Sequence, residues 1–143
     1  MTACVNETIL PDTSAFLALR DDEEGTGQVA DILRMAQTEN ANCFACLLTL
    51  MEFLYRVCKD EGEHEVRMAY EQCQTLPVRW IHESRQLLEK AAEIKAKIGL
   101  SMADAWIGAS AILNDSVLVH KDPEFEALDC AQLRLPYKGP SKK

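Results

Sequence analysis

The sequence predicts a three-layer α/β fold, in which helices cover both faces of a central, mainly parallel sheet of four to five strands. Short apolar segments alternate with longer segments whose apolar residues recur at helical spacing. Strands separated by helices do not easily pair as hairpins, which favours parallel pairing. The 143 residues fit one domain, because domains most often contain roughly 100 to 150 residues. We therefore expect a single domain over residues 1–143, with a flexible tail at residues 136–143.

The N-terminal part of the chain predicts a strand followed by two helices. Ile9 and Leu10 form a short apolar strand, and Asp12 is placed to cap a helix over residues 14–19. Apolar residues then recur at i, i+3, i+4 and i+7 in residues 29–36, which is the spacing of an amphipathic helix.

The middle of the chain predicts two further strands, each followed by helical sequence. Residues 43–48 are continuously apolar, which is typical of a strand covered on both faces, and Thr49 begins the next helix. Another helix follows over residues 61–74. Residues 76–81 are a strand candidate, and residues 82–99 form a helix that carries a Glu93–Lys97 pair and ends at Gly99.

The C-terminal part predicts one helix and the last strands. Ser101 caps a helix over residues 102–114, and residues 117–119 form a clear strand that ends near Asp122. Residues 132–135 predict a weaker strand. The order of all these elements, strand after helix, is what an open parallel sheet requires.

Cysteine usage predicts an intracellular protein with free thiols. The first residues contain neither a basic region nor an apolar core, so no secretion signal is expected, and no apolar run reaches the roughly 20 residues that a membrane span needs. Cys43 and Cys46 form a C-x-x-C, but they lie in an apolar run without a second pair at zinc spacing. We therefore interpret them as part of a buried strand in a cytoplasmic protein.

The formal net charge of −8 would repel a polyanion such as RNA. Passive binding of nucleic acid is therefore disfavoured. An acidic protein that acts on RNA would need bound cations where the phosphate approaches.

Four acidic residues, Asp12, Glu52, Asp104 and Asp122, lie where an apolar strand or loop gives way to a helix. In an open parallel sheet this place is the carboxyl edge, where ligands usually bind, so acids far apart in sequence can meet there. Carboxylate oxygens are ligands for Mg²⁺ or Mn²⁺.

Helix capping is the structural alternative for each of these acids. Asp12 fits an N-cap, and Asp122 before a proline fits an N-cap with proline at the first helical position. Thr49-x-x-Glu52 and Ser101-x-x-Asp104 both match the capping box.

Four segments of the chain resemble the motifs of the PIN-domain family. LPDTSAFLAL resembles the first motif, LLTLMEFLYRV the second, SMADAWIGASA the third and LVHKDPEF the fourth. All four occur in order, in a chain of the family's size. The resemblance implies a PIN-like domain whose catalytic and metal-binding residues are Asp12, Glu52, Asp104 and Asp122, with Thr13, Ser14 and Glu124 as accessory residues.

The resemblance also implies an activity and partners. A PIN-like domain of this kind would be a hydrolase, an Mg²⁺- or Mn²⁺-dependent endoribonuclease that cuts RNA phosphodiester bonds, similar to the toxin half of VapBC toxin–antitoxin pairs. An antitoxin protein and a homodimer are the implied protein partners, and no membrane is involved. Basic residues that are candidates for steering the RNA backbone are Arg20, Arg56, Lys59, Arg79 and Lys121.

Three residues depart from the family's pattern. Pro11 stands where an aliphatic residue is usual and removes a backbone donor at the strand end. His120 stands where Thr or Ser is common, and Glu124 stands where many relatives carry a second aspartate.

Two other functions remain open on the sequence. One is a catalytically silent PIN-like module that binds another protein, with the acids serving only as caps. The other is a receiver-like phosphoryl-binding domain, because such sheets also gather acids, a hydroxyl and a lysine at the carboxyl edge. Receivers pair two acids directly after the first strand, whereas Asp21 and Asp22 lie beyond the first helix.

Overall fold

The computed structural model describes residues 7–136 and confirms the predicted three-layer architecture. One sheet contains five strands in the order β3-β2-β1-β4-β5, and each neighbouring pair is parallel. The strands are β1 (Glu7–Pro11), β2 (Ala41–Cys46), β3 (Arg79–Ile81), β4 (Val117–His120) and β5 (Gln132–Arg134).

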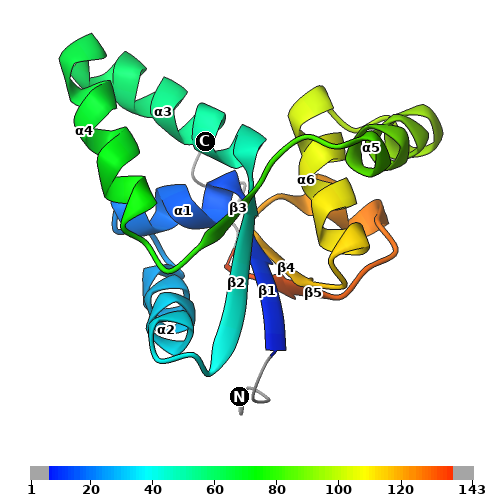
Figure 1. Ribbon diagram of the computed structural model, residues 1–143, viewed down its shortest axis with the longest axis horizontal. Helices are drawn as coiled ribbons and strands as arrows, with labels where there is room; N and C mark the ends of the chain where they lie inside the picture. Colours follow the sequence, from blue (N-terminus) through cyan, green and yellow to red (C-terminus); the bar gives the residue numbers. More distant parts are fainter. Residues whose placement is uncertain (1–6, 137–143) are drawn as a thin grey trace.

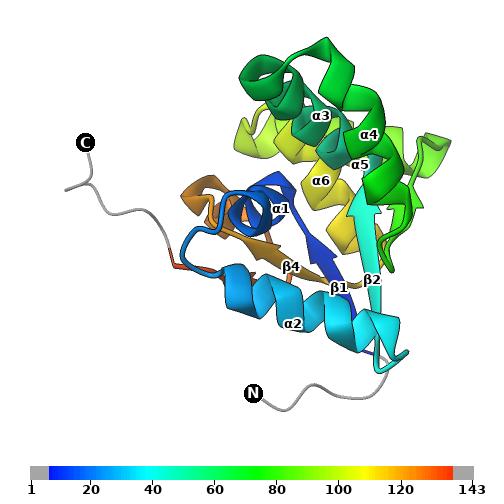
Figure 2. The same ribbon diagram turned by 90° about the vertical axis from the view of Figure 1, so that its left-hand side faces the viewer.

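The helices lie in two layers, with a hairpin beyond the end of the sheet. They are α1 (Thr13–Arg20), α2 (Thr26–Gln37), α3 (Leu47–Glu61), α4 (Glu63–Gln74), α5 (Arg85–Ile98), α6 (Met102–Leu113) and the short 3₁₀ helix η1 (Pro123–Ala127). As Figure 1 shows, α1 and α2 cover one face of the sheet, while α5 and α6 cover the other. The hairpin of α3 and α4 starts at the carboxyl end of β2, as the turned view in Figure 2 also shows.

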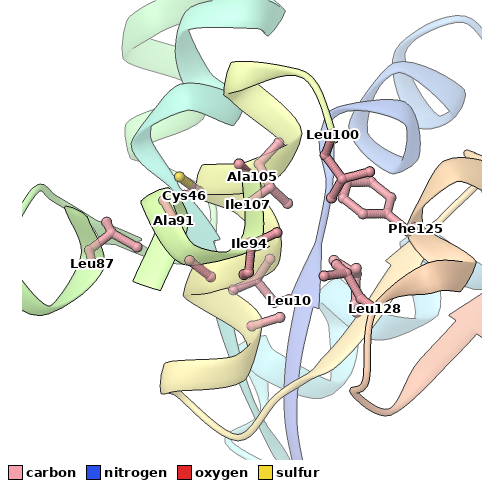
Figure 3. Packing of buried hydrophobic residues seen from close by; sticks show 13 residues of the cluster. Leu10, Cys46, Leu87, Ala91, Ile94, Leu100, Ala105, Ile107, Phe125 and Leu128 are labelled. Atoms are coloured by element: carbon pink, nitrogen blue, oxygen red, sulfur yellow. The ribbon is translucent and has the colours of Figure 1, made fainter. Parts of the chain in front are cut away.

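The two faces of the central strands are both apolar, because successive side chains of a strand point in opposite directions. Leu10 and Leu118 pack under α5 and α6, whereas Ile9 and Val119 pack under α1 and α2. Figure 3 shows the first of these clusters, in which Leu10 lies among side chains of α5, α6 and η1. This burial on both faces explains why the strands read as continuous apolar runs.

Small residues let α6 lie close to its neighbours. A Cβ added at Gly108 would lie 2.5 Å from Cδ1 of the buried Leu128, so only glycine fits there without displacement. The helix that carries Asp104 is thereby held against the segment that follows β4.

The boundary between the second strand and its helix differs from the prediction. The strand ends at Cys46, and α3 starts at Leu47 with Cys46 as its N-cap, so Thr49 does not begin the helix. The predicted capping box of Thr49 and Glu52 is therefore wrong, and Thr49 is completely buried in the first turn. Residues 47–48 are apolar in either conformation, so apolarity alone does not mark where the strand ends.

The third strand is shorter than predicted, with three paired residues in place of residues 76–81. Pro77 has no N–H to contribute to a ladder. The N–H of Leu76 bonds to the carbonyl of Cys73, and that of Val78 bonds to the carbonyl of Leu76, so this segment forms a turn.

The two ends of α5 compare differently with the prediction. The helix was expected to start at residue 82, but it starts at Arg85, because the hydroxyl of Ser84 caps it by accepting from the N–H of Leu87. Gly99 ends this helix with φ 81°, a left-handed conformation that glycine adopts without strain. The predicted Glu93–Lys97 pair is present, with 3.0 Å between the charged atoms.

The thiol prediction is confirmed for the described cysteines, which are all free: Cys43, Cys46, Cys58, Cys73 and Cys130. Cys43 and Cys46 are buried, and burial raises the pKa of Cys43 to about 12, so both serve the core of the sheet. Cys4 and the tail expected at residues 136–143, apart from Pro136, lie outside the described residues.

We expect the core between the sheet and α6 to dominate stability. Ile107 is completely buried, so Ile107→Ala should lower the free energy of unfolding by about 2 to 5 kcal/mol, measured by urea denaturation. Met102 on the same helix is 64% exposed, so Met102→Ala serves as the control and should change this free energy by less than about 0.5 kcal/mol. Equal losses in the two variants would contradict the arrangement of the core.

Candidate active site

The carboxyl ends of β1 and β4 bring the first and last of the candidate acids to one edge of the sheet. These strands are adjacent and parallel, with Pro11 in register with Val119. Asp12 directly follows β1, and its N–H donates to the carbonyl of Val119 over 3.0 Å. Because Pro11 lacks an N–H, this bond from the next residue ties the strand ends together. Asp122 follows β4 two residues after it ends.

Asp12 is buried and held by hydrogen bonds on one oxygen. It is the N-cap of α1, and its Oδ1 accepts from the N–H of Ala15 at 3.0 Å and from the hydroxyl of Ser14 at 2.7 Å. The Ser14 oxygen in turn accepts from the N–H of Lys121 at 2.9 Å. Ser14 therefore fixes the position of Asp12 relative to the segment after β4.

Glu52 reaches the same edge from α3. Its Oε1 accepts a short hydrogen bond from the hydroxyl of Thr13, the residue that follows Asp12. Both accessory hydroxyls expected from the sequence thus contact candidate acids: Ser14 contacts Asp12, and Thr13 contacts Glu52.

Asp104 enters from the opposite side of the sheet, in the first turn of α6. Its N–H donates to the hydroxyl of Ser101, the predicted N-cap, over 3.2 Å. One carboxylate oxygen of each of Asp104, Asp122 and Glu124 lies within 4.8 Å of the others. Asp122 also caps η1, since its Oδ1 accepts from the N–H of Glu124 at 3.0 Å.

Burial and, to a smaller extent, the neighbouring charges disfavour the ionised forms of two of these acids. Burial raises the pKa of Asp12 to about 7, and the carboxylates of Asp122 and Glu52 raise it as well, against the hydrogen bonds from Ser14 and Ala15. The pKa of Asp104 is also raised to about 7. Burial is the largest cause, the hydrogen bond and the charge of Asp122 come next, and the charges of Asp12 and Glu52 add to them. Four acids from four elements therefore share one electrostatic environment.

The structure brings all the candidate site residues to this edge, but only some of their ligand oxygens lie close together. Among residues 7–136, the tight group of ligand oxygens consists of Asp104, Asp122 and Glu124, so the accessory Glu124 belongs to it. Asp12 and Glu52 are near enough for their charges to raise the pKa of Asp104. The arrangement suits a divalent cation, because carboxylate oxygens are hard ligands and a cation would relieve their repulsion.

A sequence comparison decides the family. The family model described as PIN domain matches residues 9–130, which is most of the chain. The chain belongs to the PIN domain family. The resemblance carried by the four motifs is thereby confirmed, although no curated protein sequence matches the chain.

Solved structures of toxin–antitoxin proteins share the fold of this PIN domain. A toxin–antitoxin complex from Klebsiella pneumoniae is 21% identical, with a TM-score of 0.67 and coverage of 91% of this chain and 99% of that one. VapBC2 from Rickettsia felis, bound to a DNA fragment, is 14% identical, with a TM-score of 0.72 and coverage of 90% and 99%. VapC20 from Mycobacterium tuberculosis, described as a sarcin-ricin loop cleaving toxin, is 20% identical, with a TM-score of 0.69 and the same coverage.

Three of the candidate RNA-steering cations of this PIN domain are engaged with acids. Arg20 bonds to Asp60 at 3.0 Å and to Glu61 at 2.6 Å. Arg56 lies 3.8 Å from Asp21, and the Lys121 side chain is largely buried beside Glu23 at 3.3 Å. The other two candidates, Lys59 and Arg79, are exposed.

Within residues 7–136, no helix combines the length and the apolarity that crossing a membrane requires.

Sequence reasoning missed one pair of residues behind the site, His120 and Gln132. His120 was recognised only as a departure from the family's pattern, yet its ring is completely buried and bonds to Gln132 on β5. Burial lowers the pKa of His120, which keeps the ring neutral at pH 7. No local pattern links two residues twelve positions apart on neighbouring strands, so the sequence contained no signal for this pair.

The raised pKa of Asp104 predicts that stability falls as the pH rises. Its pKa is about 7 in the folded chain against 3.8 for an ordinary aspartate, so the folded state binds more protons between these values. Stability is therefore lost progressively from about pH 4 to about pH 7 and stays lost above it. In metal-free buffer at pH 8, Asp104→Asn should raise the free energy of unfolding by about 1 kcal/mol, after allowance for solvent screening.

Asp115→Asn is the matched control for this measurement. Asp115 lies exposed just after α6 with φ 51°, a conformation that asparagine also tolerates, so the variant should keep the wild-type pH dependence. The stability of the wild-type protein is measured by thermal unfolding between pH 4 and pH 7. A stability that does not decline over this range would contradict the proposed repulsion.

Proposed function

We propose that this PIN-domain chain is a metal-dependent endoribonuclease that hydrolyses RNA phosphodiester bonds and is the toxin of a toxin–antitoxin pair. The observation that carries the proposal is the convergence of Asp104, Asp122 and Glu124 within 4.8 Å, inside the electrostatic reach of Asp12 and Glu52. Asp12 is buried and Asp104 and Asp122 are half-buried, so holding these acids together is costly without a cation, which suggests a site selected for function.

The chemistry of these residues fits Mg²⁺ or Mn²⁺. All five proposed ligands offer carboxylate oxygens, and no thiol or imidazole belongs to the tight group among the described residues. Asp104, Asp122 and Glu124 would hold the cation, with Asp12 and Glu52 completing the ligand set. A bound divalent ion would supply an activated water at neutral pH and would stabilise negative charge on the phosphodiester oxygens.

Hydroxyl groups orient two of the proposed ligands, and protonation of two ligands sets the pH range in which a cation can bind. Ser14 donates to Asp12 and Thr13 donates to Glu52, so one oxygen of each carboxylate is fixed and the other is left for a ligand. Asp12 and Asp104 have pKa values of about 7 and must lose their protons before both carboxylates can hold a cation. Cation binding should therefore release protons and strengthen as the pH rises toward 8.

The toxin role rests on the neighbours with the same fold. The structures from Klebsiella pneumoniae and Rickettsia felis are described as toxin–antitoxin proteins, and VapC20 is described as a toxin that cleaves the sarcin-ricin loop. We propose by analogy that this chain acts on RNA inside the cell and binds an antitoxin protein. The homodimer that the family resemblance implies stays a prediction.

The alternative functions make different use of the same residues. For a receiver-like domain, Asp21 and the lysine after the last core strand should face the site. Asp21 instead lies near Arg20 and Arg56, and Lys121 Nζ lies near Glu23. A catalytically silent PIN module remains the principal alternative, and it predicts that the carboxylates are dispensable for any activity on RNA.

RNA cleavage by purified protein, freed of any bound inhibitor, tests the nuclease function. We expect cleavage of structured RNA with Mg²⁺ or Mn²⁺ and none with excess chelator. Asp104→Asn should reduce the rate by at least about 100-fold, because a displaced cation loses several kcal/mol of charge stabilisation. Asp115→Asn, the same chemical change at the other end of α6, should cleave at the wild-type rate. No metal-dependent cleavage by the wild-type protein would support the silent module, and equal cleavage by the two variants would contradict the role of Asp104.

Thermal unfolding with added Mn²⁺ tests the metal site without any substrate. A ligand that binds only the folded state adds about 2.7 kcal/mol to stability at 100 times its dissociation constant. We expect Mn²⁺ to raise the melting temperature more at pH 8 than at pH 5, because protons on Asp12 and Asp104 compete at the lower pH. Asp104→Asn should abolish most of this increase. An increase of the same size at both pH values would argue that Mn²⁺ binds elsewhere.

A further inference from the structure

The end of β4 holds a buried histidine whose two ring nitrogens both have partners. His120 is completely buried and lies two residues before Asp122. Its Nδ1 accepts from the N–H of Asp122 at 3.1 Å, and its Nε2 lies 2.8 Å from Oε1 of Gln132. Since Nδ1 accepts, the ring proton lies on Nε2 and is donated to Gln132.

Gln132 continues this network to the other side of the same segment. Its amide Nε2 donates to the carbonyl of Phe125 at 2.8 Å and to that of Leu128 at 3.2 Å. The amide orientation that lets Oε1 accept from His120 is also the one that lets Nε2 donate to both carbonyls. The Phe125 ring packs edge-on against the His120 ring, with 5.2 Å between their centroids. The segment from residue 121 to residue 128 is thus bound at its start, middle and end.

This segment carries two of the three acids in the tight oxygen group, Asp122 and Glu124. Their charges repel each other and repel Asp104, so a flexible segment would move them apart when no cation is bound. A buried network with every donor and acceptor satisfied instead favours a single arrangement. If the position of His120 served core packing alone, an apolar side chain would be sufficient, and it would need no hydrogen-bond partner on β5.

We propose that His120 and Gln132 are positioning residues that hold Asp122 and Glu124 ready for a divalent cation, an inference that rests on the proposed metal site. His120 positions Asp122 through its backbone N–H, and Gln132 positions the end of η1 through two carbonyls. Neither side chain belongs to the tight group of ligand oxygens. Outer partners of this kind commonly change metal affinity by about 10- to 100-fold.

The test uses two variants that keep the size of the side chain but remove its polar contacts. Gln132→Leu removes the bonds to His120, Phe125 and Leu128, and His120→Phe removes both ring nitrogens. Mn²⁺ alone is titrated by calorimetry at pH 8, and we expect the dissociation constant to rise by about 10- to 100-fold in each variant. Val29→Ala, a buried substitution on α2, controls for general loss of stability and should keep the wild-type constant.

A second measurement needs no substitution. Nitrogen-15 NMR of the wild-type protein should show the His120 ring protonated at Nε2 and slow exchange of the Asp122 amide proton. Exchange of this proton should accelerate in Gln132→Leu but not in Val29→Ala. If one variant does not fold, the other variant and these wild-type signals still decide the question.

The outcomes separate this inference from the proposed function. A wild-type protein that binds no Mn²⁺ overturns the metal site and, with it, the positioning role. A wild-type protein that binds Mn²⁺ while Gln132→Leu and His120→Phe bind it equally well overturns the positioning role alone. A His120 ring protonated at Nδ1 would likewise overturn it.

Discussion

The cost of holding several acids together at a partly buried edge of the sheet is the constraint on which the candidate site depends. Asp12 and Asp104 both have pKa values of about 7, because burial and neighbouring acids disfavour their charged forms. The fold must hold these groups together against that repulsion, and the parallel sheet provides the frame. β1 and β4 end side by side, α6 covers one face of the sheet, and α3 starts beyond the carboxyl end of β2.

Hydrogen bonds from uncharged groups, rather than salt bridges, hold the acids in place. Thr13 and Ser14 donate to Glu52 and Asp12, and backbone N–H groups donate to Asp12 and Asp122. Lys121, which precedes Asp122, pairs with Glu23, and Arg20 at the far end of α1 pairs with Asp60 and Glu61. The site can therefore keep a strongly negative character, which is what binding a divalent cation to an acidic protein requires. Carboxylates that are held by uncharged donors, and not neutralised by salt bridges, are consistent with the proposed ribonuclease function.

The sequence predicted most elements and missed those boundaries that local pattern does not mark. Continuous apolar runs gave the central strands, and Gly99 and Ser101 correctly marked helix ends, whereas α5 starts after Ser84 and not at residue 82 as predicted. The transition at Cys46 was missed because residues 47–48 are equally apolar in a strand or a buried helix. Strand β3 was predicted too long because its pairing depends on a partner strand, which local propensity does not report.

By itself, the sequence determined the α/β class, the order of strands and helices, and the acids that stand near strand ends. These properties follow from periodicity and capping, which act over a few residues. Only the tertiary structure decided that Glu124 joins Asp104 and Asp122, that Thr13 bonds to Glu52, and that Gln132 supports His120. The physical reason is that such contacts depend on side-chain distances across separate elements. A shift of about an ångström makes or breaks a hydrogen bond, and no spacing along the chain encodes it.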